Sequence, residues 1–519
     1  MKKPAVVLCL LSFVFSASAK IELATPFSDG VVLQRGMKVP VWGKAAPGSK
    51  VTVEFAGESA STVACPGGCW KVNLPPMEAS KESRTLTVTE SEAGWLWDST
   101  LDTVEVKDVL VGEVWMCAGQ SNTDCPIWGG NPHYRDGQGS TIMQMTVKPW
   151  VRLVKTPLVP ATAPKLDVKA KWMPMTPDLL ADASKGVRMP SAMGYLYALE
   201  LANALDIPIG LVDSSWGGTN IDAWTPPSGY DGINSLKDVA ALPLLNQKDF
   251  QQARSNGVYK GKGIYGAWQQ QPSALWNGMV AAYAPMACRG FIWYQGCHNS
   301  GEPQRYCDKM HALYNGWAKE FSNPDLKLYF VQLAPWGNAG IAAIQMAQAK
   351  FDAEEKNTGM AVINDVGNLK DIHPNDKRTV AKRLALHALK RDYAFDWVGD
   401  NSPTLKGWKL DGNKVELSFN DATGWYLYNP DWSVENGFEL CGADGKWQKA
   451  QIDNLAVKAT KAYGSRGVIN GANLIVTAPG VAAPKKLRYL HSAPWFGSLF
   501  NTSALPLGAF AIDDLTAQK

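Results

Sequence analysis

The spacing of apolar and polar positions changes twice along the chain, and it predicts three kinds of structure in series. From Ile21 to about Asp108, apolar residues alternate with polar ones in short runs, as in Val51-Thr52-Val53-Glu54-Phe55. Turns rich in Pro and Gly, such as Ala46-Pro47-Gly48, separate these runs. Alternation with frequent turns is typical of half-buried strands in a small sandwich. We therefore predict an N-terminal β domain over residues 20–108.

The second pattern, from about Val109 to Tyr393, alternates continuous apolar runs with helical spacing. This alternation predicts an α/β domain with a largely parallel sheet over residues 109–399. The stretch from Gly129 to Gly186 has neither spacing and is expected to be an irregular insertion. The expected strands are 114–118, 209–212, 291–294, 328–331 and 360–363, and the expected helices are 193–205, 342–355 and 378–389.

Alternation with period two returns after about Asp400, for example in Val415-Glu416-Leu417-Ser418-Phe419. This predicts a C-terminal β domain over residues 400–519. The predicted fold class is therefore α/β, flanked at both ends by β-sandwich-like segments.

The first 19 residues carry a pattern of their own. Lys2 and Lys3 precede an apolar run from Ala5 to Phe15, and Ala17-Ser18-Ala19 follows with small residues. This order predicts a secretory signal peptide over residues 1–19 and a secreted or periplasmic protein. The run is too short for a membrane anchor, and no later stretch is apolar enough for membrane insertion.

Charge and cysteine content narrow the classes of partner and cofactor. The formal net charge is only +3 and the chain has no long run of Lys or Arg, which argues against nucleic acid or anionic membranes as partners. Eight cysteines remain after the leader, so an exported chain can form disulfides. Cys65 with Cys69, and Cys297 with Cys307, are local candidates, but the sequence does not decide the pairing. Because no His or second Cys pair lies near Cys65 and Cys69, we expect no metal site there.

Candidate chemistry follows three of the expected strands. Ser121 follows the first in Gly119-Gln120-Ser121-Asn122, Gly217 and Gly218 follow the second, and Asn299 follows the third. The carboxyl ends of parallel strands meet at one edge of a sheet, where loops and helix N-termini converge. A serine in a tight turn can act as a nucleophile, and glycine N–H groups and an Asn amide can hold an oxyanion. Taken singly, each is more often a cap or a turn residue.

The candidate base is His373, which lies just before the last strong helix of the α/β part. A His can take the serine proton while an acid orients its imidazole. Asp371 stands two positions before His373 and is the candidate acid. Asp365 or a backbone carbonyl is the alternative, which would leave a Ser-His dyad. Among the six His residues, His298 is the competing base.

The order Ser, Gly, Asn and His resembles the four blocks of the SGNH (GDSL-like) hydrolase superfamily, and within it the sialate O-acetylesterase family. The resemblance covers nearly the whole chain after the leader. Its motifs include Phe27 to Arg35, Val111 to Trp115, Trp216 to Thr219, Trp276 to Met279, Trp293 to Gly296 and His373-Pro374.

The resemblance implies an SGNH-type three-layer domain and a secreted esterase that hydrolyses O-acetyl esters of sialic acids on glycans. It implies that Ser121 is the nucleophile, with His373 and Asp371 completing the catalytic set. The implied oxyanion donors are the Ser121 N–H, an N–H at Gly217 or Gly218, and the Asn299 side chain. Substrate contacts are expected from Gln120, Gln295 and Trp216. The expected partner is an O-acetylated sialic acid or sialoglycan, and no metal or organic cofactor is expected.

Two residues depart from the family pattern, and three alternatives remain. Cys297 stands where the family usually has an acidic residue, and His298 follows it. The alternatives are an acetyl esterase acting on plant polysaccharide such as acetylxylan, an inactive carbohydrate-binding protein, and a cysteine enzyme that uses Cys297 with His298. Adjacent residues of an extended segment point to opposite faces, which argues against the last.

Overall fold

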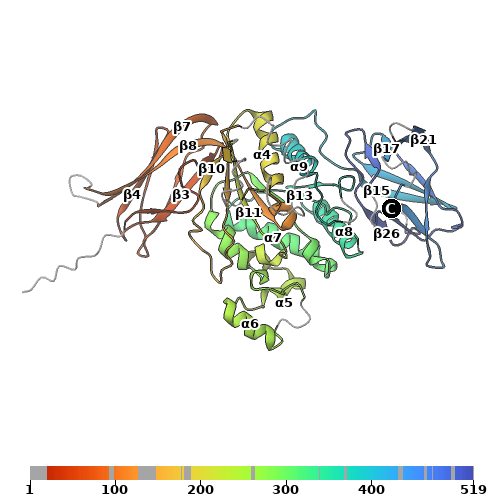
Figure 1. Ribbon diagram of the computed structural model, residues 1–519, viewed down its shortest axis with the longest axis horizontal. Coiled ribbons are helices and arrows are strands. Elements are labelled where there is room, and N and C mark those ends of the chain that lie inside the picture. The colour runs from red at the N-terminus through yellow and green to blue at the C-terminus, as the bar shows by residue number, and fades with distance from the viewer. Residues whose placement is uncertain are drawn as a thin grey trace, which may run out of the picture.

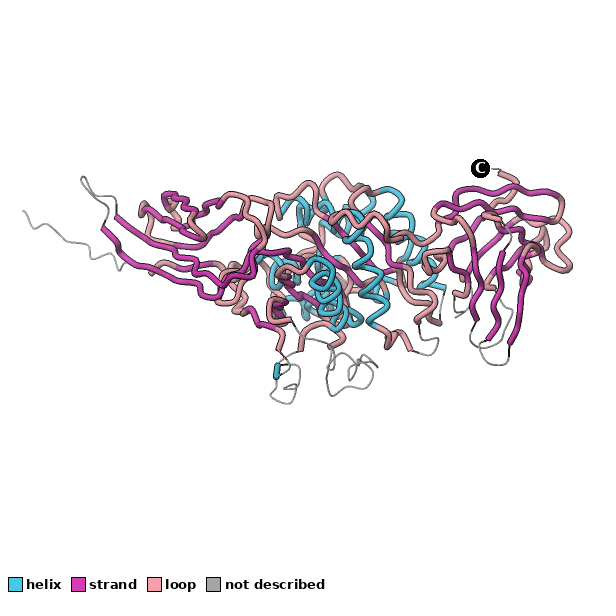
Figure 2. Tube along the Cα trace, turned by 90° about the horizontal axis from the view of Figure 1, so that it is seen from above, coloured by secondary structure: helices cyan, strands magenta, loops and turns pink. Residues whose placement is uncertain are grey.

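Strands occupy both ends of the elongated molecule, and helices and strands alternate in its middle (Figures 1 and 2). The leader predicted over residues 1–19 lies outside the described residues. The computed structural model describes residues 20–92, 99–126, 148–176, 178–179, 189–258, 263–337, 339–367, 371–429, 436–460, 464–469, 471–491 and 497–517.

The long strand β8 (Ser99–Gly119) joins the N-terminal strands to the central sheet. Its first half is largely exposed, whereas every residue from Val109 to Gly119 is buried. It therefore crosses the domain boundary predicted between residues 108 and 109 without a break. The N-terminal strands are β1 (Glu22–Leu23), β2 (Val32–Gln34), β3 (Val39–Lys44), β4 (Lys50–Phe55), β5 (Glu58–Val63), β6 (Cys69–Leu74) and β7 (Ser80–Glu92).

The N-terminal strands form two groups with different partners. Strands β1, β3 and β6 make a small antiparallel sheet of their own. Strands β4, β5 and β7 pair antiparallel and continue into β8, while β2 pairs parallel with β8. Buried apolar side chains of this region form one continuous core with those of the α/β part.

The central sheet is mixed, and its inner strands are parallel. Along the order β10-β9-β11-β8-β12-β13-β14, the pairs from β9 to β14 are parallel and β10 is antiparallel. Near-complete burial of β11 and β12 explains their continuous apolar runs, since helices cover such strands on both faces. The additional strands are β9 (Val151–Lys155), β10 (Trp172–Pro174), β11 (Ile209–Ser215), β12 (Gly290–Tyr294), β13 (Lys327–Val331) and β14 (Thr358–Ala361).

The prediction that Gly129 to Gly186 is wholly irregular is wrong, because β9 and β10 come from this stretch. Arg152 and Lys155 interrupt the apolar pattern of β9, so the sequence did not indicate a buried strand there. The side chains of Arg152 and Lys155 are nevertheless buried, and both pair with carboxylates, Arg152 with Asp108 and Lys155 with Asp213.

Four longer helices pack in two pairs against this sheet (Figure 1). Helix α4 (Ala192–Leu205) packs beside α9 (Lys377–Arg391), and α7 (Tyr306–Glu320) packs beside α8 (Ala339–Glu354). Shorter helices and turns occupy the connections: α1 (Ser121–Asp124), η3 (Asp222–Trp224), η4 (Pro227–Tyr230), η5 (Asn234–Leu236), α5 (Lys237–Ala240), α6 (Gln247–Ser255), η6 (Trp268–Gln270), η7 (Trp276–Val280), η8 (Ala281–Tyr283), η9 (Cys297–Asn299) and η10 (Pro303–Arg305).

The C-terminal strands form three antiparallel sheets of four strands around a separate apolar core. Their orders are β15-β16-β23-β20, β21-β22-β17-β25 and β19-β18-β24-β26. The strands are β15 (Thr404–Asp411), β16 (Lys414–Asn420), β17 (Trp425–Asn429), β18 (Phe438–Cys441), β19 (Trp447–Lys449), β20 (Gln451–Ile452), β21 (Leu455–Thr460), β22 (Gly464–Ile469), β23 (Leu474–Thr477), β24 (Lys486–Tyr489), β25 (Leu499–Asn501) and β26 (Phe510–Ile512).

Among the described residues no helix is long and apolar enough to cross a membrane. The eight described cysteines are all free thiols, so neither Cys65 with Cys69 nor Cys297 with Cys307 forms a disulfide.

Candidate active site

Ser121 lies in a tight turn between β8 and α1. The strand ends at Gly119, where φ is +141° and a Cβ atom would lie 2.3 Å from the Tyr294 carbonyl oxygen. Only glycine fits such a close approach. Ser121 is the first residue of α1, so its N–H has no acceptor within the helix. Ser121 is 6% exposed, and the turn places a hydroxyl group and a backbone donor at the same point.

The structure brings His373 and Asp371 to this serine. His373 Nε2 lies 3.0 Å from Ser121 Oγ, and His373 Nδ1 lies 3.1 Å from Asp371 Oδ1. The same carboxylate oxygen accepts the His373 backbone N–H at 2.9 Å. In the tautomer with the proton on Nδ1, Nε2 is free to accept the serine proton. This chain of contacts is the arrangement that a serine nucleophile needs.

The other acid and the other base considered from the sequence are engaged elsewhere. Asp365 forms a two-point ion pair with Arg383, at 2.6 and 2.7 Å. His298 Nε2 lies 3.2 Å from the Ile264 carbonyl oxygen, and burial lowers the pKa of the His298 imidazole. The geometry therefore favours Asp371 and His373.

Asn122 holds the loop that carries His373, a contact that the sequence did not indicate. Its Nδ2 donates to the Ile372 carbonyl oxygen at 3.0 Å, and its Oδ1 accepts from Lys377 Nζ at 2.6 Å. Asn122 and Lys377 are both buried. The residue after the candidate nucleophile thus fixes the backbone next to the candidate base.

The loop after β11 lies against the serine turn. The Trp216 N–H donates to the Gly119 carbonyl oxygen at 3.1 Å. A Cβ atom at Gly217 would lie 3.5 Å from Ser121 Cβ, so this backbone passes close to the candidate nucleophile. Gly218 adopts a φ of +69° and faces open space. Of the two predicted glycine donors, Gly217 therefore lies beside Ser121, and no contact of Gly218 with Ser121 is seen.

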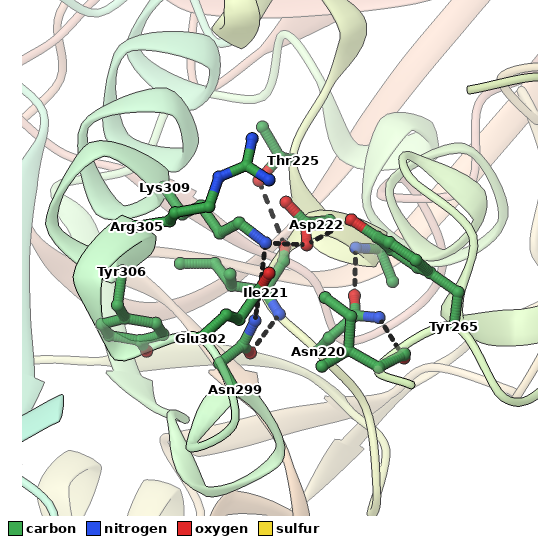
Figure 3. A network of polar contacts seen from close by, with 12 residues as sticks. Asn220, Ile221, Asp222, Thr225, Tyr265, Asn299, Glu302, Arg305, Tyr306 and Lys309 are labelled. Carbon is green, nitrogen blue, oxygen red and sulfur yellow. Dashed lines mark hydrogen bonds and ion pairs between the residues drawn. The ribbon is translucent and has the colours of Figure 1, made fainter. Parts of the chain in front are cut away.

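Gln295 and Asn299 are fully buried in an internal polar network, of which Figure 3 shows the part around Asn299. Gln295 Nε2 donates to Asn299 Oδ1 at 2.8 Å and to the Thr219 carbonyl oxygen at 3.0 Å. Asn299 Oδ1 also accepts the Ile221 N–H at 3.1 Å, and its Nδ2 donates to Glu302 at 2.9 Å. These contacts connect the loops after β11 and β12, and the oxyanion role of Asn299 stays a prediction.

Gln120 joins the serine turn to the loop after β12. Its Oε1 accepts the backbone N–H groups of Gly296 at 3.2 Å and of His298 at 3.3 Å. Two donors on one oxygen fix the orientation of the amide beside Ser121. These bonds do not involve substrate, so the substrate contact through Gln120 stays a prediction.

Buried ion pairs also connect the loops after β11 and β12, and the sequence did not predict them. Lys309 Nζ lies 2.7 Å from Asp222 Oδ2 and also pairs with Glu302 (Figure 3). The Tyr265 hydroxyl donates to the same Asp222 oxygen at 2.9 Å. Burial, with Asp222 alongside, raises the pKa of the Tyr265 phenol. Asp222 can be read from the sequence after the Trp216 to Thr219 motif. Its partner Lys309 lies on α7, and only the tertiary fold brings the two side chains together.

A second cluster lies beside α1. Lys155 Nζ contacts Asp124 Oδ1 at 2.9 Å, Asp213 Oδ2 at 2.8 Å and Ser215 Oγ at 2.9 Å. Because Asp124 is the last residue of α1, these contacts tie the helix that begins with Ser121 to the ends of β9 and β11.

Cys297 does not have the environment of a nucleophilic thiol. Burial raises its pKa to about 12, which keeps the thiol protonated near neutral pH. Its neighbour His298 is bonded to Ile264, as described above. The pair therefore lacks the activation that a cysteine enzyme requires.

Comparison with known proteins finds similarity to carbohydrate esterases. Residues 259–390 match the family described as carbohydrate esterase, sialic acid-specific acetylesterase. The chain is 28% identical to sialate O-acetylesterase from Rattus norvegicus over 488 residues, covering 85% of this chain and 86% of the relative. It is 27% identical to the Homo sapiens sialate O-acetylesterase over 487 residues, which cover 86% of this chain and 85% of that relative.

A solved structure resembles nearly the whole chain. It is a carbohydrate acetylesterase from Xanthomonas citri, with a TM-score of 0.75 and 28% sequence identity. The match covers 95% of this chain and 99% of that one. The likeness therefore extends to the terminal β segments as well as the α/β part.

Proposed function

Since the chain is an esterase that resembles the sialate O-acetylesterases along most of its length, we propose that it hydrolyses O-acetyl esters of sialic acids on glycans. We further propose that its α/β part is an SGNH-type hydrolase domain over residues 109–399, between β domains over 20–108 and 400–519. The observation that carries the reaction is the contact of Ser121 Oγ with His373 Nε2 at 3.0 Å, continued through Asp371.

In the proposed first half-reaction, His373 Nε2 takes the Ser121 proton while Oγ attacks the acetyl carbonyl carbon. Asp371 stabilises the imidazolium that forms. The tetrahedral intermediate then collapses, and His373 protonates the departing sugar oxygen. This leaves an acetyl group on Ser121 and a free hydroxyl on the sugar. In the second half-reaction His373 activates water, which releases acetate and restores Ser121.

The proposed oxyanion donors are the Ser121 N–H, an N–H of Gly217 or Gly218, and the Asn299 amide. The open N-terminus of α1 and the close approach of Gly217 to Ser121 support the backbone donors. Loss of one donor is expected to lower kcat by about 10²–10³. Gln120 and Trp216 are proposed to contact the bound substrate. The predicted contact through Gln295 does not fit its complete burial, so Gln295 is proposed only to hold the loops beside the substrate through Thr219 and Asn299.

Secretion or periplasmic location is part of the proposal. It rests on the basic, apolar and small-residue order of residues 1–19.

The test compares acetate release by the wild type, by Ser121→Ala and by Ser255→Ala, whose serine is exposed on α6. Substrates are an O-acetylated sialoglycan, acetylated xylan and a generic aryl acetate. We expect wild type and Ser255→Ala to release acetate, with the highest kcat/KM on the sialoglycan, and Ser121→Ala to be inactive.

Three outcomes would contradict parts of the proposal separately. Undiminished release by Ser121→Ala would refute the nucleophile. Higher kcat/KM on acetylated xylan would refute the sialic acid substrate and leave the mechanism intact. No release from any substrate by the folded wild type would favour an inactive carbohydrate-binding protein.

A further inference from the structure

Three potential metal ligands converge between helices α7 and α8. Cys307 and His311 are four residues apart on α7, so their side chains lie on one face of the helix, one turn apart. Glu354 is the last residue of α8, which packs against α7. Among the described residues, this is the one group of three such side chains whose ligand atoms all lie within 4.8 Å of one another.

Two of the three distances between ligand atoms are near those of a metal site, and the third, between Cys307 and His311, is within 4.8 Å. His311 Nε2 lies 2.9 Å from Glu354 Oε2, and Cys307 Sγ lies 3.4 Å from the same oxygen. In a tetrahedral zinc site, with bonds of 2.0–2.3 Å, ligand atoms are about 3.3–3.6 Å apart. Small side-chain movements would therefore place all three at bonding distance from one ion.

A fourth residue provides an independent indication. His311 Nδ1 lies 2.8 Å from Glu355 Oε1, so its two ring nitrogens face different carboxylates. Metal-binding histidines commonly donate their second N–H to a carboxylate, which fixes the tautomer and the ring orientation. The His311 ring also packs edge-on against Phe351, with centroids 4.9 Å apart. This leaves Nε2 as the atom directed at Cys307 and Glu354.

The group of Cys307, His311 and Glu354 lies partly open to solvent. Lys350 Nζ is 3.8 Å from Glu354 Oε1, the other oxygen of that carboxylate. The Cys307 residue is buried, whereas the side chain of Glu354 is 44% exposed. One side of the group therefore opens to solvent, and the other closes on the packed helices.

We propose that Cys307, His311 and Glu354 bind one Zn²⁺ ion, with water as the fourth ligand and Glu355 orienting His311. Binding releases the Cys307 thiol proton to water, since the thiolate is the ligand. The ion ties the first turn of α7 to the end of α8. Tyr306, next to Cys307, donates to Gln295 Oε1 at 2.8 Å, so the same turn supports the network that holds Gln295 and Asn299. The role is structural and takes no part in ester hydrolysis.

The test uses the full chain, stripped of metal by a chelator and titrated with Co²⁺ and then Zn²⁺. Cys65 and Cys69 are exposed thiols, so the titration is run in the Cys65→Ser/Cys69→Ser background to remove their contribution. We expect one Co²⁺ per chain, with a thiolate-to-cobalt charge-transfer band in the near ultraviolet and visible bands of tetrahedral intensity. Zn²⁺ should displace Co²⁺ and raise the melting temperature.

Substitutions assign the ligands. Cys307→Ser is expected to abolish the charge-transfer band, and His311→Ala to weaken Zn²⁺ binding by at least about 100-fold. Glu355→Gln should weaken it by about 10–100-fold and keep the band. Cys441→Ser, a buried cysteine of the C-terminal strands, is the matched control and should bind as the background does.

If the folded Cys65→Ser/Cys69→Ser protein shows no thiolate-to-cobalt band when Co²⁺ is added, the proposal is overturned, whatever the other variants show. A band that survives in folded Cys307→Ser overturns it as well. Either result would leave His311 as an ordinary bridge between Glu354 and Glu355. Esterase activity is not the readout, so failure here leaves the proposed function untouched.

Discussion

His373 Nε2 and Ser121 Oγ lie 3.0 Å apart although 252 positions separate the two residues in the chain. Ser121 follows β8, and His373 lies on the connection from β14 to α9, at the same edge of the sheet. The parallel inner strands bring these two ends together. Asp371 and Asn122 then set the orientation and the position of the imidazole.

Replacement of Asp371 tests whether catalysis uses a Ser121-His373-Asp371 triad or a Ser121-His373 dyad. Asp371→Asn and Asp371→Ala are expected to lower kcat on an aryl acetate by about 10²–10⁴, because the imidazolium loses its carboxylate and the His373 N–H loses an acceptor. Steady-state kinetics measure the effect, with Ser121→Ala as the inactive reference. Asp365→Asn is the control and should change kcat little, since Asp365 pairs with Arg383. The reverse ranking of the Asp371 and Asp365 variants would assign the orienting role to Asp365.

Asn122 is predicted to be a positioning residue for His373. Asn122→Ala removes the donor to Ile372 and an acceptor for Lys377, so kcat should fall with little change in KM. Asn122→Asp keeps the acceptor for Lys377 and loses only the donor to Ile372. We expect it to retain the thermal stability of the wild type more closely than Asn122→Ala while it still loses kcat. If both variants lower stability alone and leave kcat unchanged, Asn122 has a purely structural role.

The sequence predicted those parts of the fold and site that depend on local pattern. Strands β11 to β14 and helices α4, α8 and α9 were placed within a few residues, as for α9, expected over 378–389 and observed over Lys377–Arg391. The strand expected over 114–118 is only the end of the much longer β8, and α7 was not among the expected helices. Candidate residues were found because parallel strands share an edge, which depends on topology and not on distance along the chain.

Features that depend on tertiary partners were missed. Strand β9 carries Arg152 and Lys155, whose burial is explained only by carboxylates from other segments. The contact of Asn122 with Lys377, and that of Asp222 with Lys309, have no signature in either local segment. The spacing of Cys307 and His311 was readable, but Glu354 is 43 positions from His311 and only helix packing brings it near.

Cys297 is predicted to be inert toward alkylation in the folded enzyme. Burial raises its pKa to about 12, and the thiolate is the form that reacts with iodoacetamide. At neutral pH we expect full esterase activity after treatment, with label on Cys65 and Cys69, which are exposed. Peptide mass spectrometry locates the label, and Cys297→Ser shows whether the thiol matters at all. Rapid labelling of Cys297 with parallel loss of activity would instead support a cysteine enzyme.

Glu113 is predicted to make stability depend on pH in the acidic range. Its carboxylate is fully buried and accepts from Arg35 at 2.6 Å, from Arg289 at 3.1 and 3.2 Å, and from Gln34 at 3.0 Å. Burial alone would raise its pKa, but the hydrogen bonds and charge of Arg289, and then of Arg35, outweigh burial and hold the pKa below its usual 4.5. Unfolding returns the carboxyl to that usual pKa, so the unfolded state binds the proton more tightly.

The stabilisation by ionised Glu113 is therefore complete above pH 4.5 and is lost as the pH falls through the folded pKa. Glu113→Gln should lower the free energy of unfolding at pH 7 by about 1.5–3 kcal/mol, the value of hydrogen bonds to a charged group. Urea unfolding of both proteins over a series of pH values measures the difference, which should stay constant above pH 4.5 and shrink below it. Arg488→Gln, which breaks the more exposed pair with Glu439, is the control and should cost less at every pH. A difference between wild type and Glu113→Gln that grows on acidification would mean that the pKa of Glu113 is raised in the folded protein.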